Sequence, residues 1–456
     1  MRVRVLLVSH RFPPDDVGGV ERYTEGLAAS LTSDGDRVSI LARRSIRGSK
    51  EIQMQRERLA DGTALYRLVA GSFNFEHFLD NHERLERMFT MAMLESSPEV
   101  VHINHLMGFS PNFIRIAHRL GAAVVVSLHD FYFSCPKVHL QQPSGNLCSG
   151  PDDGRECRKA CFTNGPHDSP AYWGIRARYF RQSLEMAERI LCYSEYVHSH
   201  FRAELGDKAP IQVIPNGVPR RAINCESRRD DRTSGPINLA YFGTVAPHKG
   251  THVILEALRI AGLSSVNLAI IGHVPEVEYA RKLRKEAATI PGVTLRMYGK
   301  YERAELSFLL RDVDCVVVPS LVPEAGPIVP REALAEGVPV VAARLGALPE
   351  LIREGENGFT YDAHRPDELA SILSRIAAND ALRTALRAGA RNSPVITVNE
   401  HAKQVRLTYE RAIEEFESNP RRSADTAEFN LLQRMLIERG CDPSIGVQRT
   451  PDVSCV

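Results

Sequence analysis

Short apolar runs alternate with amphipathic, helix-like segments along most of this chain, and this alternation limits the possible folds more than any other feature. The runs are rich in Val, Ile and Leu and are nearly continuous, which indicates strands whose two faces are both buried. Buried strands that are separated by helices form parallel sheets with helices covering each side. The sequence therefore predicts an α/β fold.

The apolar runs fall into two groups, so we expect two Rossmann-like parallel-sheet domains that face a central cleft. A chain of 456 residues is also too long for one ordinary core. Strands of the first domain are expected at 3–9, 37–43, 99–104, 123–129, 189–194 and 211–218. Those of the second domain are expected to begin at 237, 266, 293, 314 and 338.

Changes in composition mark the expected boundaries of these domains. The first domain is expected over 1–218, a polar linker over 219–236, the second domain over 237–397 and a further helix over 398–417. Another helical stretch is expected near 366–391. The tail, 418–456, is polar, and we expect it to be poorly ordered apart from one helix near 426–438.

Composition also excludes several partners and locations. The formal net charge of +1 gives no reason to expect nucleic-acid binding, and no apolar run approaches the roughly 20 residues that span a bilayer. The start, MRVRVLLVSH, indicates a buried strand rather than a signal peptide, because its apolar segment is short and ends at His10 and Arg11. We therefore expect a cytoplasmic protein whose nine cysteines are largely reduced or metal-bound.

Two glutamates, Glu324 and Glu332, are separated by seven residues in a strand–loop–helix–strand pattern. The pattern places Glu324 in a loop at the carboxyl end of a strand, where open α/β sheets bind ligands. It places Glu332 in the first turns of a helix that begins with Ile328 and Val329, whose free amides can hold an anion. The carboxylates can accept hydrogen bonds from sugar hydroxyl groups, and the nearby amides can bind a diphosphate. This combination suits a sugar nucleotide.

Three further motifs end strands of the two expected sheets. Gly18 and Gly19 directly precede a helix, where glycine lets backbone approach a phosphate, although a flexible loop ending in a helix cap has the same pattern. Lys249 follows Gly243 at a helix start and could neutralise a diphosphate leaving group, or could be an ordinary surface lysine. His129 ends a strand, where it could face the cleft or serve in capping or packing.

Two aspartate pairs, DGD at 34–36 and DVD at 312–314, could suggest a divalent metal. Both lie in turns that enter strands, which is the wrong end of a sheet for chemistry, and aspartate is common in turns. We therefore expect them to be turn and cap residues and expect catalysis without a metal ion.

Together these residues resemble the retaining glycosyltransferases of family 4, which have the GT-B fold. The resemblance covers residues 1 to about 417 and rests on five motifs in order: GGVER at 18–22, HD at 129–130, PNGV at 215–218, G-x(5)-KG at 243–250 and E-x(7)-E at 324–332. It implies transfer of a hexose from a nucleoside-diphosphate sugar to a hydroxyl group of a glycan, a lipid-linked molecule or a small molecule, in polysaccharide or glycoconjugate synthesis at the cell surface. It also implies an acceptor-side first domain, a donor-binding second domain and a last helix, 398–417, that crosses back to the first domain.

Carried over residue by residue, the resemblance implies three catalytic residues. Glu324 would hold hydroxyls near the anomeric carbon, Lys249 would bind the diphosphate and His129 would face the donor sugar. The implied donor-binding residues are Gly18, Gly19, Asn216, Gly243, Thr244, Lys249, Ile328, Val329 and Glu332, of which Glu332 would bind the ribose. The leaving phosphate is expected to accept the proton, so the protein supplies positioning and charge stabilisation.

The chain departs from the family pattern at two places. Thr244 stands where the family often has Arg, which removes a cation from the diphosphate site, and Ala325, Gly326 and Pro327 stand where it often has Phe-Gly. A protein that binds nucleotide sugars without catalysis, or a sugar-nucleotide epimerase of the same fold, therefore remains an alternative.

An insert at 131–172 holds four cysteines, Cys135, Cys148, Cys157 and Cys161, in a segment rich in Gly, Pro, Asp and Asn. A structural zinc ion or an iron–sulfur cluster could organise such a segment, although the cysteine spacing is not a familiar zinc pattern and free thiols or disulfides remain open. A subset of family 4 is similar here. Because the insert follows His129, we expect it to shape the acceptor site.

Three arginines after the insert, Arg176, Arg178 and Arg181, lie near aromatic residues in the sequence. They could contact anionic lipid head groups at the inner face of a membrane, as a lipid-linked acceptor would require, or could form a solvated helix face.

Overall fold

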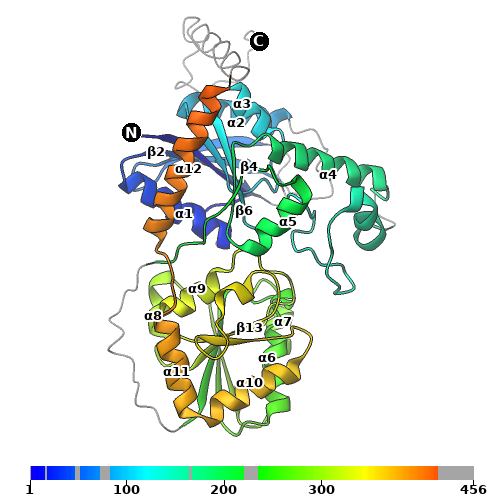
Figure 1. Cartoon of the computed structure of the whole chain (residues 1–456), viewed down its shortest axis with the longest axis vertical. Helices are drawn as coiled ribbons and strands as arrows, with labels where there is room; N and C mark the ends of the chain where they lie inside the picture. The colour runs from blue at the N-terminus through cyan, green and yellow to red at the C-terminus, as the bar shows by residue number, and fades with distance from the viewer. Residues whose placement is uncertain are drawn as a thin grey trace, which may run out of the picture.

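The computed structural model describes residues 2–15, 18–46, 52–71, 83–163, 167–219 and 235–419. Most of the expected linker and tail, including the helix expected near 426–438, lies outside the described residues. The chain forms two α/β lobes, an N-terminal lobe built from residues up to 219 and a C-terminal lobe that begins at 235 (Figure 1). The predicted fold class, two parallel-sheet units, is confirmed.

The N-terminal lobe contains an eight-stranded sheet in the order β3-β4-β2-β1-β5-β6-β7-β8. Its strands are β1 (Arg4–Ser9), β2 (Arg37–Ser45), β3 (Gln53–Arg58), β4 (Ala64–Ala70), β5 (Val100–Ile103), β6 (Ala123–Leu128), β7 (Arg189–Cys192) and β8 (Ile211–Val213). Neighbouring strands are parallel except β3 and β4. The helices are α1 (Gly19–Ser33), α2 (Glu83–Ser96), α3 (Phe113–Arg119), α4 (Pro170–Glu185) and α5 (Glu195–Leu205).

Both faces of this sheet are buried, as the continuous apolar runs predict. Leu6 and Val8 of β1 belong to one hydrophobic cluster, whereas Val5 and Leu7 belong to another on the opposite face. Helices α2, α3 and α5 supply side chains to the first cluster, and α1 supplies side chains to the second.

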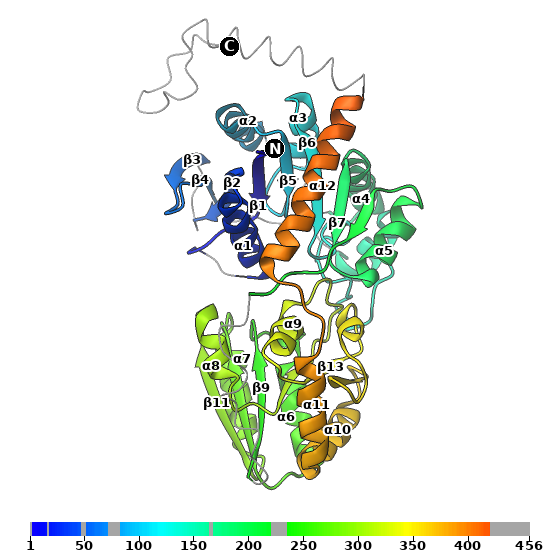
Figure 2. The same ribbon diagram turned by 60° about the vertical axis from the view of Figure 1, so that its left-hand side comes forward.

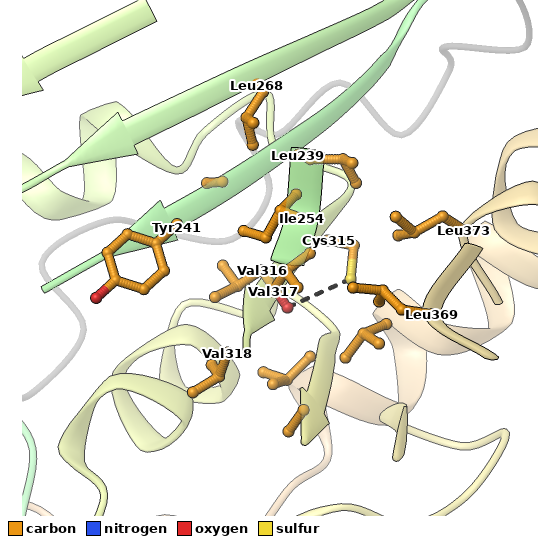
Figure 3. Packing of buried hydrophobic residues seen from close by; sticks show 14 of the residues in the cluster. Leu239, Tyr241, Ile254, Leu268, Cys315, Val316, Val317, Val318, Leu369 and Leu373 are labelled. Atoms are coloured by element: carbon orange, nitrogen blue, oxygen red, sulfur yellow. Dashed lines mark hydrogen bonds between the residues drawn. The ribbon is translucent and has the colours of Figure 1, made fainter. Parts of the chain in front are cut away.

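The C-terminal lobe contains a six-stranded, fully parallel sheet in the order β11-β10-β9-β12-β13-β14. Its strands are β9 (Ile237–Phe242), β10 (Val266–Ile271), β11 (Val293–Gly299), β12 (Cys315–Val318), β13 (Val340–Ala343) and β14 (Gly358–Tyr361). The helices are α6 (Thr251–Ala261), α7 (Val277–Ala287), α8 (Leu306–Leu309), α9 (Ile328–Ala335), α10 (Pro366–Ala378) and α11 (Asp380–Arg391). Figure 3 shows the central strands packed against Ile254 of α6 and against Leu369 and Leu373 of α10.

Three strands were not predicted, and each lacks a continuous apolar run. β3, QMQRER, is a largely polar strand that pairs only with β4. β4 contains Arg67, which is 1% exposed and forms ion pairs with Asp15 and Glu57. β14 is four residues long and begins at Gly358, where a Cβ atom would lie 1.9 Å from the Val340 carbonyl oxygen.

Helix α12 (Val398–Ser418) leaves the C-terminal lobe and packs against α1 in the N-terminal lobe (Figure 2). Tyr409 of α12 is fully buried, and its hydroxyl lies 2.6 Å from Nδ1 of His102. Arg406 pairs with Asp36 at 2.8 Å. The predicted crossover helix is therefore confirmed.

Candidate active site

A cavity of about 530 Å³ lies between the two lobes. Its walls come from the start of α1, the end of β6, the loops after β9, β11 and β12, and the start of α9. All of the residues predicted to act in catalysis or donor binding line it: Gly18, Gly19, His129, Asn216, Gly243, Thr244, Lys249, Glu324, Ile328, Val329 and Glu332. The structure therefore brings together residues that the sequence places more than 300 positions apart.

Glu324 lies in the loop after β12, as predicted, and faces Lys249 from the loop after β9. Lys249 Nζ lies 2.7 Å from Glu324 Oε1, and the Ser320 hydroxyl donates to the same oxygen at 2.7 Å. Burial alone raises the pKa of Glu324, but the Lys249 ammonium and these hydrogen bonds outweigh it and hold that pKa below its ordinary value. Glu324 is therefore ionised at neutral pH and can accept hydrogen bonds from hydroxyl groups.

Glu332 lies in α9 and pairs with Arg303, whose Nη2 is 2.9 Å from Glu332 Oε1. Burial raises the pKa of Glu332, and the Arg303 charge opposes this change. Arg303 was not predicted, because it follows no glycine motif. A carboxylate held by an arginine at the cavity wall can accept hydrogen bonds from a ligand diol.

Two helix N-termini, one from each lobe, face the same part of the cavity. Helix α1 begins at Gly19 and α9 begins at Ile328, and a Cβ atom on Gly19 would lie 3.9 Å from Cδ1 of Ile328. The Gly18 amide donates to Glu21 Oε2 at 3.0 Å, and a Cβ atom on Gly18 would lie 2.5 Å from that oxygen. Free amides and helix dipoles at both tips attract an anion to the space between them.

His129 directly follows β6 and is held by aromatic residues that the sequence did not indicate. Its ring stacks on Tyr193 at 4.6 Å and meets the edge of Tyr23 at 4.5 Å, and its Nε2 lies 3.2 Å from the Tyr193 hydroxyl. Burial lowers the pKa of His129 well below its ordinary value, so the ring is neutral at pH 7. Asp130 turns away from the cavity and pairs with His105 at 2.9 Å.

Asn216 and the loop after β12 join the two lobes at the cavity edge. The Asn216 side-chain amide donates to the Gly326 carbonyl at 2.9 Å, and the Ser194 hydroxyl donates to the Ala325 carbonyl at 2.6 Å. A Cβ atom on Gly326 would lie 2.7 Å from Cβ of Tyr193, so glycine is needed for this approach. The departure from the family's Phe-Gly pair thus coincides with a tight contact between lobes.

Although Thr244 stands where the family often has arginine, cations other than Lys249 line the cavity. They are Arg22, Lys300 and Arg303. The Arg22 guanidinium lies over the ring of Tyr301 at 5.3 Å, which joins α1 to the loop after β11. Arg22 belongs to the GGVER motif, which was the one available signal for it.

The aspartate pairs occupy structural positions, away from the cavity. Asp36 accepts a hydrogen bond from the Val3 amide at 2.9 Å, and Asp314 accepts one from the Asn238 amide at 2.8 Å. Within the described ranges, no group of three or more His, Cys, Asp or Glu residues is arranged to hold a metal ion. Catalysis without a metal remains a prediction.

The four cysteines of the insert line one small pocket together, and none forms a disulfide. Burial, with the neighbouring thiols, raises the pKa of Cys157 to about 12. Beside this pocket, Phe162 stacks on Trp173 at 3.9 Å. The sulfur atoms are not gathered as metal ligands in the described structure. The zinc or iron–sulfur hypothesis therefore stays a prediction.

For Arg176, both the lipid contact and the solvated helix face are wrong. This residue is 2% exposed, donates to the Tyr132 carbonyl and lies over the ring of Phe180 at 4.4 Å. Its position on the buried face of α4 excludes contact with head groups. Arg178 and Arg181 are exposed on α4. No helix in the described part of the chain has the length and apolar character needed to cross a membrane.

Comparison with known proteins identifies the class to which this cavity belongs. The family described as Glycosyltransferase Family 4 matches residues 17–221, and the family described as Glycosyl transferases group 1 matches residues 226–393. The two matches together extend over most of the chain. The chain therefore belongs to the family 4, group 1 glycosyltransferases of the GT-B fold, which transfer a sugar from a nucleotide sugar.

Individual relatives are distant but similar over most of their length. Glycogen synthase of Mycobacterium tuberculosis is 24% identical over 386 residues, covering 82% of this chain and 85% of that protein. D-inositol 3-phosphate glycosyltransferase of Mycobacterium marinum is 24% identical over 426 residues, covering 89% and 84%.

Solved structures show the same fold at lower identity. Sucrose-phosphate synthase of Thermosynechococcus elongatus has a TM-score of 0.67 and 17% identity, with 91% of this chain and 100% of that chain covered. Anabaena HepE, solved with UDP and glucose, has a TM-score of 0.62 and 16% identity, with 90% and 100% covered.

Proposed function

We propose that this protein is a retaining hexosyltransferase that uses a UDP-sugar and glycosylates a hydroxyl group. One observation carries the proposal: the Lys249–Glu324 pair lies in a cavity that the N-termini of α1 and α9 face from opposite lobes. That cavity offers positive potential for a diphosphate beside acceptors for sugar hydroxyls. The UDP found with HepE supports the choice of base.

Each part of the donor has a partner in this arrangement. The diphosphate lies between the two helix tips near Lys249, the ribose diol binds Glu332, and the transferred sugar lies between Glu324 and His129. The acceptor oxygen bonds to the anomeric carbon on the face that the leaving phosphate departs from. The bond from that carbon to the phosphate oxygen breaks, and the acceptor proton passes to the leaving phosphate.

The charge that builds on the leaving group is met by groups of the chain itself. The amides at the start of α9 are held in place by the helix before the reaction, so they stabilise the diphosphate without reorganising, and the Lys249 ammonium adds its positive charge. We therefore propose catalysis without a metal ion. Donor entry has to loosen the Lys249–Glu324 contact, because both partners are needed by the ligand.

The acceptor is proposed to be a glycan, a lipid-linked molecule or a small molecule, bound by the N-terminal lobe. We further propose a role in polysaccharide or glycoconjugate synthesis at the cytoplasmic side of the membrane. The exposed residues Arg178 and Arg181 remain available for contact with head groups.

A panel of UDP-, GDP- and ADP-sugars tests the proposal by thermal shift and by donor hydrolysis without acceptor. We expect a UDP-sugar to raise the melting temperature and to be hydrolysed slowly. Lys249→Ala should abolish both effects, whereas Lys285→Ala, on the exposed face of α7, should change neither. Tight binding without hydrolysis or transfer would indicate a binding protein, and conversion of the donor sugar would indicate an epimerase.

A further inference from the structure

The cysteine insert reaches across the cleft and contacts the C-terminal lobe. The side-chain amide of Gln141 donates to the Leu321 carbonyl at 2.7 Å. The ring of His139 stacks on the ring of His248, with centroids 4.8 Å apart and an interplanar angle of 29°. Neither His139 nor Gln141 is among the residues that line the central cavity.

The two contacts meet the loops that carry the catalytic pair. His248 directly precedes Lys249, and Leu321 lies three positions before Glu324. The Leu321 amide donates to the His248 carbonyl at 2.9 Å, which ties the two loops together. The insert therefore contacts both residues of this backbone hydrogen bond, His248 and Leu321, and His248 is adjacent to Lys249 in the sequence.

The turn that presents His139 and Gln141 has an unusual backbone. Val138 and Leu140, on either side of His139, adopt left-handed conformations with φ of 62° and 49°. Such conformations are strained for non-glycine residues and persist only where the surroundings enforce them. Leu140 is 2% exposed and its carbonyl accepts a hydrogen bond from the Cys148 amide at 2.8 Å, so the turn is held from within the insert.

We propose that Gln141 and His139 are positioning residues for the transfer reaction, holding the loops of Lys249 and Glu324 in register with the donor. This role rests on the proposed function and extends it, because it gives the insert a part in donor chemistry. Small displacements of positioned groups lower rates strongly, about 100-fold for 1 Å. The contacts act through the two loops, since neither side chain is among those that line the cavity.

The test compares Gln141→Ala with Gln142→Ala, a matched control. The Gln142 side chain stays within the insert, 3.5 Å from Glu156. With UDP-glucose and no acceptor, we expect Gln141→Ala to lower kcat for hydrolysis about ten-fold, as one lost orienting hydrogen bond would do. The affinity for UDP alone should change less than about two-fold, because UDP lacks the sugar that Glu324 holds. Gln142→Ala should match the wild type in both.

A second pair of variants tests whether the stacking of the His139 ring on His248 contributes to catalysis. His139→Phe keeps a flat ring against His248 and should retain most of the wild-type kcat, whereas His139→Ala should show a loss similar to that of Gln141→Ala. Equal losses in both variants would contradict the stacking role.

Hydrogen exchange without any nucleotide gives a readout that does not depend on activity. Peptides covering 245–250 and 319–324 should exchange faster in Gln141→Ala than in Gln142→Ala. Unchanged exchange, or faster exchange with an unchanged kcat, would overturn the proposal. If the wild type does not hydrolyse UDP-glucose, the proposed function fails for that donor, and the exchange rates alone still decide whether the insert holds the loops.

Discussion

At the scale of single residues, the cavity is organised by charges that are paired before any donor arrives. Lys249 and Glu324 face each other at 2.7 Å, and Arg303 and Glu332 at 2.9 Å. In each pair, the cation stabilises the charged form of a largely buried carboxylate. When a donor binds, its groups replace this cation or interact with the carboxylate beside it. The same side chains therefore serve stability in the free protein and binding in the complex.

We expect Lys249→Met to lower the free energy of unfolding at neutral pH by about 2 kcal/mol, because Glu324 then keeps a largely buried charge with no ammonium beside it. In the wild type, the lowered pKa of Glu324 stabilises the folded state above the ordinary carboxyl pKa of about 4.3, and this is lost as the pH falls through the lowered value.

In Lys249→Met, burial is left unopposed, so Glu324 should take up its proton at higher pH than in the wild type. The stability difference between the two proteins should therefore shrink as the pH falls from neutral toward about 4. Urea unfolding at several pH values measures this difference. A constant difference would show that the pair does not control the protonation of Glu324.

Glu324→Ala should lower turnover by roughly 100- to 1,000-fold, the loss typical of removing one group that stabilises a transition state. The protein should stay folded, because Glu324 lies at a cavity wall and not in a core cluster. Glu256→Ala, on the exposed side of α6, is the control and should keep full activity. Near-normal turnover of Glu324→Ala in initial-rate assays would remove Glu324 from the site.

At the scale of elements, the first residues of the insert join the core of the N-terminal lobe, and the rest of the insert packs around a small separate hydrophobic cluster. Its own cluster consists of Cys157, Phe162 and Trp173, with Cys161 and Tyr172 beside it. The pocket lined by the four cysteines is also lined by Gln141, which reaches the C-terminal lobe. An interaction that orders the four cysteines therefore also supports the contact between Gln141 and the loop of Glu324.

If thiolates bind a structural metal, purified full-length protein should contain about one zinc or iron-sulfur centre per chain after anaerobic preparation. Cys157→Ser should lose it, and Cys192→Ser, a buried cysteine of β7 outside the insert, should keep it. Elemental analysis and absorption spectra measure the content. A wild-type protein without zinc or iron would refute the metal hypothesis.

At the scale of the whole molecule, several connections hold the lobes around the cavity. They include α12, the contacts of Ser194 and Asn216 with the loop after β12, the insert, and the contact of Arg22 with Tyr301. In another, the Glu350 carboxylate accepts hydrogen bonds from the amides of Glu195 and Tyr196 at the start of α5. These connections surround the cavity from several sides, so the relative position of the lobes sets its shape.

Removal of residues 398–456 should prevent the N-terminal lobe from folding, because it uncovers the cluster that buries Val405, Tyr409 and Phe416 against the sheet. Each large buried side chain contributes about 1.5–3 kcal/mol, which is a large part of the stability of a domain. Truncation after residue 419 should leave the protein folded. Circular dichroism and solubility of the two truncated chains measure this, and a folded, soluble chain ending at 397 would contradict it.

Much of the fold and of the site follows from local patterns. Runs such as those of β6, β9 and β12 are largely apolar because both faces of the sheets are buried, and the ends of these strands precede His129, Lys249 and Glu324, respectively. The missed strands, β3, β4 and β14, owe their existence to neighbouring strands that complete their hydrogen bonds. The roles of Arg303 and Tyr193 depend on partners far away in sequence, which no local pattern records.

The sequence by itself determined two parallel α/β units and several of the residues that line the cleft, because strand burial and the glycine and acidic motifs are local properties, whereas the return of the last helix was implied by the family resemblance. Tertiary structure alone decided that α1 and α9 point at the same space, that Arg176 is buried and that Gln141 touches the loop of Glu324. Those relations depend on how the two lobes pack against each other. Packing brings together residues that are far apart in the sequence, so the sequence separation of two residues does not predict their distance in space.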